Sequence, residues 1–238
     1  MKLIGLDSSG LVAGVAVVED GILLAEYTTD YKRTHSQTLL PMLAELRDML
    51  ELDLNTVDAV AVASGPGSFT GLRIGAATAK GLGLALDKPL IEVPTLEGLA
   101  YNMWGTDKLV CPMMDARRNQ VYTGIYEFRR EKTDFLLSTV TAQCAVEVRD
   151  ILERLNELGR EVILLGDGAP VYRDIIEDTL RVPHSYSPAG RNRQRAANIA
   201  VLGSLYFAQG RTVTAMQHRP EYIRKGQAGA EQKEFLKL

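Results

Sequence analysis

A carboxylate followed by two hydroxyls stands close to the start of the chain, in the segment Asp7-Ser8-Ser9-Gly10. A carboxylate at the end of a strand can hold a hydrated magnesium ion, and hydroxyls on a tight turn can receive a phosphate. Asp7, Ser8 and Ser9 are therefore candidates for a nucleotide site. The same residues also suit a common turn in which Asp and Ser side chains bond to their own backbone. The segment by itself leaves both interpretations open.

A second candidate for phosphate binding is the glycine-rich segment at residues 64–75, SGPGSFTGLRIG. It follows an apolar run typical of a buried strand and precedes a helical pattern. Glycines at such a junction expose backbone N–H groups at the positive end of a helix, which suits an anion. Gly65, Gly67 and Ser68 are the candidate contacts. The Lys-Ser/Thr ending of a P-loop is missing, so the segment does not predict a P-loop ATPase.

The histidines do not have the spacing of a metal site. His35, His184 and His218 lie far apart, and no two match the helical patterns H-E-x-x-H or H-x-x-x-H. We expect solitary polar histidines and no bound metal. Without a Gly-x-Ser-x-Gly segment, a Ser-His-Asp hydrolase is not indicated either. Two classes stay open: an ATP-using enzyme such as a small-molecule kinase, with Asp7 holding magnesium, and a protein without catalysis of its own.

The elements that position these residues follow one order twice. The first half predicts strands at 3–7, 12–18, 22–28, 58–64 and 88–93, and helices after residue 35 and at 72–86. A further helix, which Thr95 is expected to cap, runs to about residue 104. The second half predicts strands at 109–115, 121–128, 135–140 and 161–165, a turn at 129–133, and helices at 146–158 and 192–209. The first strand of each half ends on an aspartate, Asp7 and Asp115.

Three antiparallel strands, a helix, a parallel strand and a further helix, written twice, are the layout of the actin-like, ribonuclease-H-like (ASKHA) fold. Apolar residues make up 46% and charged residues 24%, which is typical of a chain with a sizeable core. We therefore predict an α/β protein with two duplicated lobes of mixed sheet flanked by helices, residues 1–104 and 105–225. Residues 226–238 hold few apolar side chains, so we expect a flexible tail.

Two helices of the first half carry more apolar or glycine surface than one buried stripe requires. Leucines recur at positions 39, 43, 46 and 50, and Leu40 widens this face. The helix at 72–86 contains Gly75, Gly81 and Gly83, although an interior glycine costs about 1 kcal/mol relative to alanine. Close approach of another backbone would compensate for this cost. We expect these helices to meet another protein chain as well as their own sheet.

The charge pattern limits which classes of partner the chain can attract. A formal net charge of −3 gives no strong field for gathering nucleic acid. Basic residues cluster weakly at 117–118, 191–195 and 218–225, either as a solvated face or as a weak contact with RNA phosphates. The apolar run at the N-terminus is too short for a signal peptide or a membrane span, so we expect a cytoplasmic protein.

Five segments carry a resemblance to a known family. They are LDSS at 6–9, HSQTLLP at 35–41, GPGSFTGLRIG at 65–75, VPTLEGLA at 93–100 and DARRNQVY at 115–122. The HSQ segment followed by GPGSFTGLR at this separation is highly specific. In these segments the chain resembles the bacterial TsaB proteins, also called YeaZ. The second half adds only general agreement.

The resemblance implies a non-catalytic subunit for making threonylcarbamoyl-adenosine next to the anticodon of tRNA. TsaD, the catalytic subunit, shares the fold and carries two metal-binding histidines four residues apart. In this sequence Thr95 and Leu99 stand at the corresponding places, and neither can replace imidazole as a ligand. The resemblance therefore implies a scaffold that has lost the metal site.

The resemblance also implies partners. The helices at 36–50 and 72–86 would contact TsaD, or a second copy of the chain when TsaD is absent, and the ATPase TsaE would join the assembly. No intrinsic cofactor is expected; ATP or ADP with magnesium would belong to the interface with TsaD, and tRNA would touch the chain weakly or indirectly. The residues expected at the helical interface are Leu39, Leu40, Leu43, Leu46, Leu50, Arg73, Ile74, Ala77, Lys80 and Gly81.

Overall fold

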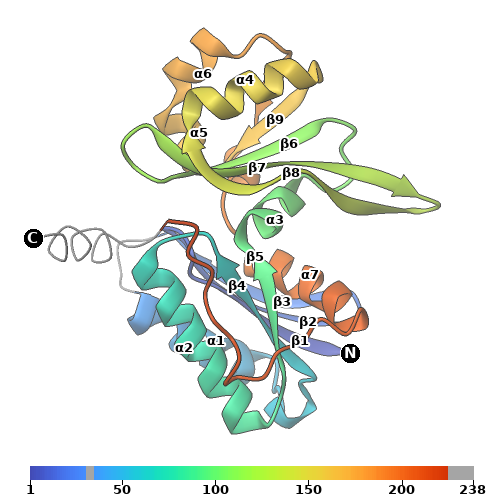
Figure 1. The fold of residues 1–238 in the computed structure, drawn as a ribbon. Helices are drawn as coiled ribbons and strands as arrows, with labels where there is room; N and C mark the ends of the chain where they lie inside the picture. Colours follow the sequence, from blue (N-terminus) through green and yellow to red (C-terminus); the bar gives the residue numbers. More distant parts are fainter. Residues whose placement is uncertain (31–34, 225–238) are drawn as a thin grey trace, which may run out of the picture.

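The first half of the chain forms one mixed sheet with its helices (Figure 1). A computed structural model describes residues 1–30 and 35–224. The elements of this half are β1 (Lys2–Asp7), β2 (Ala13–Glu19), β3 (Ile22–Thr29), α1 (His35–Met49), η1 (Leu54–Thr56), β4 (Ala59–Gly65), α2 (Phe69–Leu86), β5 (Leu90–Pro94), α3 (Thr95–Ala100) and η2 (Tyr101–Met103).

The second half repeats the arrangement around a second sheet. Its elements are β6 (Leu109–Asp115), β7 (Gln120–Glu131), β8 (Asp134–Glu147), α4 (Val148–Leu158), β9 (Val162–Leu165), α5 (Gly168–Val171), α6 (Arg173–Thr179), β10 (His184–Tyr186), η3 (Ala189–Arg191) and α7 (Ala196–Ala208).

The two sheets have the same topology. Their strand orders are β3-β2-β1-β4-β5 and, in the matching direction, β8-β7-β6-β9-β10. In each sheet the first three strands pair antiparallel, and the fourth and fifth continue in parallel from the first. The predicted duplication and the predicted actin-like fold are therefore confirmed.

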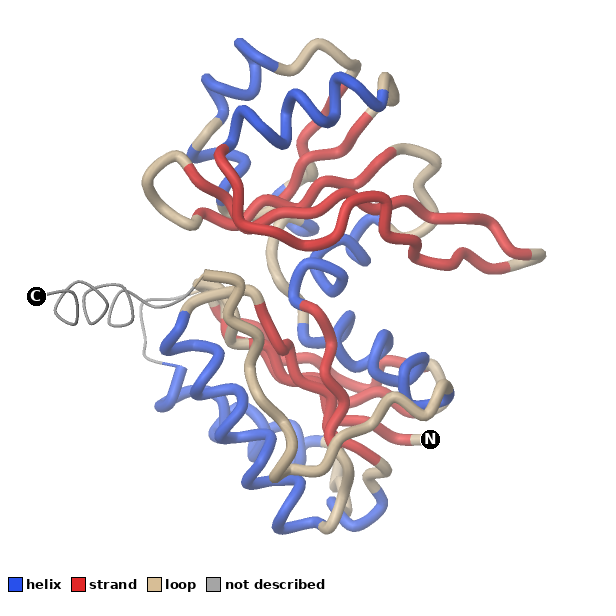
Figure 2. The backbone as a smooth tube through the Cα atoms, in the orientation of Figure 1, coloured by secondary structure: helices blue, strands red, loops and turns tan. Residues whose placement is uncertain are grey.

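Helices cover both faces of each sheet. Helices α1 and α2 pack on the outer face of the first sheet, and α4, α5 and α6 pack on the outer face of the second. Helices α3 and α7 lie between the two sheets (Figures 1 and 2). Each crosses to the other half, because buried side chains of α3 join the core of the second sheet and those of α7 join the core of the first. The predicted lobe at 105–225 therefore contains a helix that completes the other lobe.

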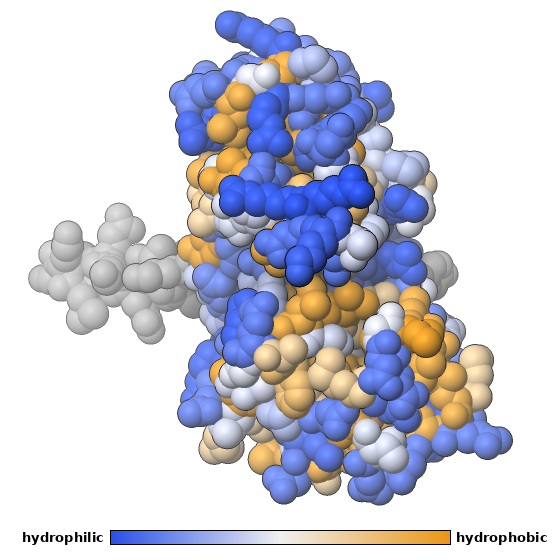
Figure 3. Space-filling model, turned by 90° about the vertical axis from the view of Figure 1, so that its right-hand side faces the viewer, coloured by the Kyte–Doolittle hydropathy of each residue, from blue (hydrophilic) through white to orange (hydrophobic). Residues whose placement is uncertain are grey.

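The remaining differences from the predicted elements are local. Helices α5 and α6 and strand β10 were not predicted, because each is short and shows little apolar periodicity. The β7–β8 hairpin continues through the predicted turn at 129–133, with Arg130 opposite Phe135 and Glu131 opposite Asp134. The charged end of this ribbon projects into solvent, and Figure 3 shows apolar surface gathered on the lobe below it.

The segment after α7 returns along the first lobe as a strap, defined here as residues 212–224. Val213 pairs with Leu90 at the edge of β5, and the Glu221 N–H donates to Ser64 O at 2.7 Å. Arg224 Nη1 then donates to Ala116 O of the second lobe at 2.6 Å. The strap therefore ends between the lobes. The predicted tail at 226–238 lies outside the described residues. Among the described residues, no helix is both long enough and apolar enough to cross a membrane.

Candidate functional site

The side chain of Asp7 is turned onto its own backbone. It is 2% exposed, and Oδ1 accepts from Ser9 N at 2.9 Å and from Ser9 Oγ at 2.7 Å. Burial raises the pKa of Asp7 to about 6, although both bonds from Ser9 oppose this shift. Ser8 Oγ donates to Gly71 O at 2.9 Å. Of the two interpretations left open by the sequence, this geometry is that of the self-bonded turn.

The glycine-rich segment at 64–75 packs against the turn at Asp7-Ser8-Ser9. Ser68 N donates to Ser9 O at 2.7 Å, and Ser68 Oγ caps α2 by accepting from Gly71 N at 3.4 Å. A Cβ atom on Gly67 would overlap Ser9 O, and one on Gly71 would overlap Ser8 O. The glycines thus let the start of α2 approach the Ser8–Ser9 backbone closely. The Asp7 carboxylate, buried and bonded to Ser9, is not open to the hydrated magnesium ion that an independent kinase would require.

The two positions that correspond to the TsaD histidines are structural in this chain. Thr95 Oγ1 is buried and accepts from Gly65 N at 3.2 Å, so it joins β4 to the start of α3. The prediction that Thr95 caps α3 is wrong, because the cap position is Pro94 and no side chain bonds there. Leu99 is buried in the core between the lobes. Within residues 1–30 and 35–224, no three His, Cys, Asp or Glu side chains are grouped to hold a metal ion.

The histidines differ in their surroundings. His35 Nε2 lies 2.9 Å from Gly10 O at the junction of the lobes. His218 is 1% exposed, and its Nδ1 lies 2.7 Å from Glu92 Oε1. Burial lowers the pKa of His218, against the opposing effect of Glu92. The buried imidazole of His218 therefore holds the strap against β5.

The regular leucine stripe of helix α1 packs against the first sheet of its own chain. Leu39, Leu43 and Leu46 are buried in the core of the first sheet, and Leu50 packs against the same cluster. The assignment of Leu39, Leu43 and Leu46 to a partner surface is therefore wrong. Their helical spacing is that of the side of an amphipathic helix that faces its own core. Leu40, on another side of α1, is 52% exposed.

Helix α2 presents an exposed stripe to solvent. Arg73, Ala77 and Gly81 are exposed at intervals of four residues, and Phe69 (46% exposed) and Leu84 (64% exposed) extend the stripe in both directions. We call these five residues the α2 stripe. Phe69 and Leu84 were not predicted, although their helical spacing from Arg73 and Ala77 could have indicated them.

The ends of the stripe and its flanks differ from its centre. The Arg73 guanidinium carbon lies 3.9 Å from the centroid of the Phe69 ring, so this end of the stripe is cationic. Ile74 and Lys80 flank the stripe and are half-buried. Their place in a partner interface stays a prediction.

The glycines of α2 divide into two kinds. A Cβ on Gly75 would lie 2.6 Å from Ser8 Oγ, and one on Gly83 would lie 2.9 Å from Leu90 Cδ2. These glycines therefore allow close packing within the chain. A Cβ on Gly81 would meet nothing within 4 Å. The cost of a glycine in mid-helix is compensated inside the chain at positions 75 and 83 but not at position 81.

A cavity of about 1010 Å³ lies between the lobes. Of the predicted phosphate contacts, Ser9, Gly67 and Ser68 reach its wall, whereas Asp7, Ser8 and Gly65 do not. Side chains from both halves line it, among them Arg117, Arg118, Arg193, Arg224 and Tyr122. The sequence indicated only scattered basic residues, because the convergence of these arginines depends on how the lobes meet.

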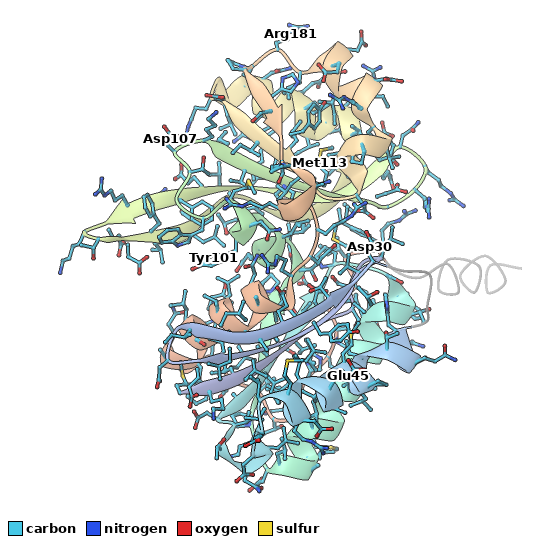
Figure 4. All side chains as sticks on the ribbon, turned by 180° about the vertical axis from the view of Figure 1, so that it is seen from behind. Asp30, Glu45, Tyr101, Asp107, Met113 and Arg181 are labelled. Atoms are coloured by element: carbon cyan, nitrogen blue, oxygen red, sulfur yellow. The ribbon has the colours of Figure 1, made fainter. Side chains whose placement is uncertain are left out.

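Asp30, at the end of β3, lies near this junction (Figure 4). Its Oδ2 is 3.4 Å from Arg193 Nε, which links the edge of the first sheet to the segment before α7. The cavity is thus bordered by a contact between the two halves.

Comparison with known proteins places this geometry in a family. The TsaD family model, described as tRNA N6-adenosine threonylcarbamoyltransferase, matches residues 23–231. The tRNA threonylcarbamoyladenosine biosynthesis protein TsaB of Bacillus subtilis is 34% identical over 230 residues, which cover 97% of each chain. The chain belongs to the TsaB family.

Other members of the family agree over nearly the full length. The TsaB protein of Escherichia coli is 29% identical, with 96% of each chain covered. A solved Pseudomonas aeruginosa structure titled YeaZ has a TM-score of 0.73 at 29% identity and covers 93% of this chain and 99% of that one. A second P. aeruginosa structure, titled as similar to peptidase YeaZ, has a TM-score of 0.77 at 29% identity, with coverages of 94% and 99%.

Proposed function

We propose that this chain acts in tRNA threonylcarbamoyladenosine biosynthesis as a non-catalytic subunit that docks a TsaD protein through the α2 stripe. Gly81 is the observation that carries the proposal. It is an exposed glycine in the middle of an 18-residue helix, and its own chain makes no use of the missing side chain. An interior glycine costs about 1 kcal/mol in a helix, so a compensating contact from outside the chain accounts for it.

The neighbours of Gly81 suit a second helix. Ala77 and Gly81 are small and stand one turn apart, so a partner backbone can approach α2 closely at its centre. Leu84 and Phe69 supply apolar area on either side, and Leu40 of α1 adds an exposed leucine on the helix that packs beside α2. Burial of such side chains contributes about 25 cal/mol per Å² to association.

The absence of a catalytic role is inferred from the two positions that correspond to the TsaD histidines. Thr95 bonds at the junction of β4 and α3, and Leu99 is buried in the core. We place ATP or ADP and magnesium only at the junction with TsaD, since the carboxylate of Asp7 is buried and bonded to Ser9 in this chain. In the proposed assembly a second copy of the chain uses the same stripe when TsaD is missing, and TsaE joins the TsaD-containing complex.

The test is a double substitution on the stripe, Ala77→Asp with Gly81→Gln. Both positions are exposed, so the fold is retained while the stripe receives a charge and a bulky polar side chain. Co-purification with TsaD and self-association should both be lost, with circular dichroism unchanged. Ala142→Asp, at an exposed position of β8, is the matched control and should bind TsaD normally. Wild-type binding by the double variant would rule out this docking surface.

A further inference from the structure

We propose that the cavity between the lobes binds the phosphate–ribose backbone of a single-stranded segment of RNA. This inference rests on the proposed function, which makes tRNA the RNA at hand. Four arginines from separate parts of the chain line the cavity: two from the β6–β7 loop, one from the segment before α7 and one from the end of the strap. They gather positive charge at one place in a chain whose formal net charge is −3.

The carboxylates at the cavity are already engaged by other groups. Asp115 accepts from Tyr172 Oη at 2.7 Å, and its second oxygen lies 3.0 Å from Arg117 Nη1. Asp167 Oδ1 accepts from the backbone N–H of Asp115 at 3.2 Å. Glu221 Oε2 accepts from Gln143 Nε2 at 2.6 Å. Arg117 is paired with Asp115 and Arg193 with Asp30, so Arg118 and Arg224 are the arginines at the cavity that have no carboxylate partner in the described part of the chain.

Two arginines have donors to spare within the described part of the chain. Arg118 is exposed and forms neither an ion pair nor a side-chain hydrogen bond there. Arg193 bonds to Asp30 through Nε, while its Nη1 is buried and has no partner. A buried donor without a partner costs free energy, and an acceptor entering the cavity would remove that cost.

The loop that carries two of the arginines is held in an unfavourable conformation. Arg117, Arg118 and Asn119 all have left-handed backbone angles, with φ of 65°, 56° and 57°. Residues other than glycine seldom adopt this region of backbone angles, and those that do cluster at ligand sites. The hydrogen bonds from Arg117 N to Asp115 Oδ1 (2.8 Å) and from Val148 N to Asn119 O (3.0 Å) fix the loop from both sides.

The exposure of the arginines favours a polyanion over a free nucleotide. The side chain of Arg117 is 84% exposed, so any one phosphate contact there is weakened by solvent and salt. An RNA strand that brings several phosphates gains binding free energy at every arginine, because each contact releases counterions from the RNA. Tyr122 and Tyr222 also line the cavity, and unpaired bases commonly stack on aromatic rings.

The test compares two exposed arginines that have no ion pair in the described chain. Arg118→Glu changes the cavity, and Arg130→Glu makes the same charge change at the end of the β7–β8 hairpin. Each full-length variant is titrated, with and without TsaD, against a fluorescent tRNA anticodon stem-loop at several salt concentrations. Duplex RNA, AMP and ATP serve as comparison ligands. Arg118→Lys keeps the charge and should bind the stem-loop nearly as the wild type does.

Arg118→Glu should weaken stem-loop binding by about fivefold or more and reduce the slope of log K against log salt by about 0.7. Arg130→Glu should leave both quantities unchanged. Equal losses in the two glutamate variants would show a general charge effect and overturn the proposal. Tighter binding of AMP or ATP than of the stem-loop would overturn it as well. TsaD co-purification is measured in parallel, because loss of docking would count against the proposed function and loss of RNA binding alone would not.

Discussion

The two kinds of glycine in α2 make opposite predictions for the same substitution. Gly81→Ala adds a methyl group where nothing lies within 4 Å. It removes the cost of a glycine in mid-helix, so the free energy of unfolding should rise by about 1 kcal/mol. For a chain of this length, that gain raises the melting temperature by about 2–4 °C.

Gly83→Ala makes the same change two residues further along. Its methyl group would lie 2.9 Å from Leu90 Cδ2 and 3.0 Å from Lys88 O. Leu90 is fully buried and Lys88 O is backbone, so neither can move away freely. Overpacking of this kind costs about 1–3 kcal/mol, which exceeds the gain in helix propensity. The net result should be a loss of about 1 kcal/mol.

Urea unfolding followed by circular dichroism measures both free energies. The measurement is repeated over a range of protein concentrations, because self-association through the α2 stripe would make the midpoint depend on concentration. At concentrations where the midpoint is constant, the two variants should shift in opposite directions. A loss of stability in Gly81→Ala equal to that in Gly83→Ala would refute the conclusion that Gly81 faces open space in the single chain.

Three further predictions concern the core and the buried charges. Burial raises the pKa of Asp7 from its ordinary value of 3.8 to about 6 in the folded chain, so ionisation destabilises the fold as the pH rises between these values. Relative to wild type, Asp7→Asn should therefore gain up to about 3 kcal/mol in urea unfolding between roughly pH 4 and 7; a difference that does not vary with pH would contradict this. Glu26 Oε1 caps the start of α7 by accepting from Ala197 N at 3.0 Å. Glu26→Ala should therefore lower the free energy of unfolding by about 1–2 kcal/mol in thermal unfolding, and an unchanged stability would show that this bond does not stabilise the helix. Leu43→Ala should cost about 2–5 kcal/mol and Leu40→Ala less than about 0.5, and similar values would contradict their different burial.

The sequence was sufficient for the fold because the fold depends on local periodicity and order. Short apolar runs separated by turn residues indicated the strands, and the strand-end aspartates Asp7 and Asp115 indicated the repeat. Helices α5 and α6 and strand β10 escaped prediction because short elements give too few periods to recognise. Helix α7 was predicted, but its exchange to the first sheet was not, since periodicity shows that one face is buried and not which sheet buries it.

The candidate sites were harder to predict for two physical reasons. A regular leucine stripe looks the same whether it faces a core or a partner, and at Leu39, Leu43 and Leu46 it faces the core. Glycines at the start of a helix look the same whether they admit a phosphate or a second stretch of backbone, and Gly67 admits the latter. Gly81 differs from Gly75 and Gly83 in having open space around it, and this difference becomes visible only when the atoms around each glycine are known.

The position of α7 also constrains the order in which the chain can fold as it is synthesised. All five strands of the first sheet have been made once Pro94 is added, yet one face of that sheet is covered by Ile199 and Leu202. A nascent chain must therefore carry an exposed apolar face, including Leu3 and Ile91, until more than a hundred further residues have been added. The lobe that begins first is finished last, and a chain that stops before α7 lacks the helix that covers the inner face of the first sheet.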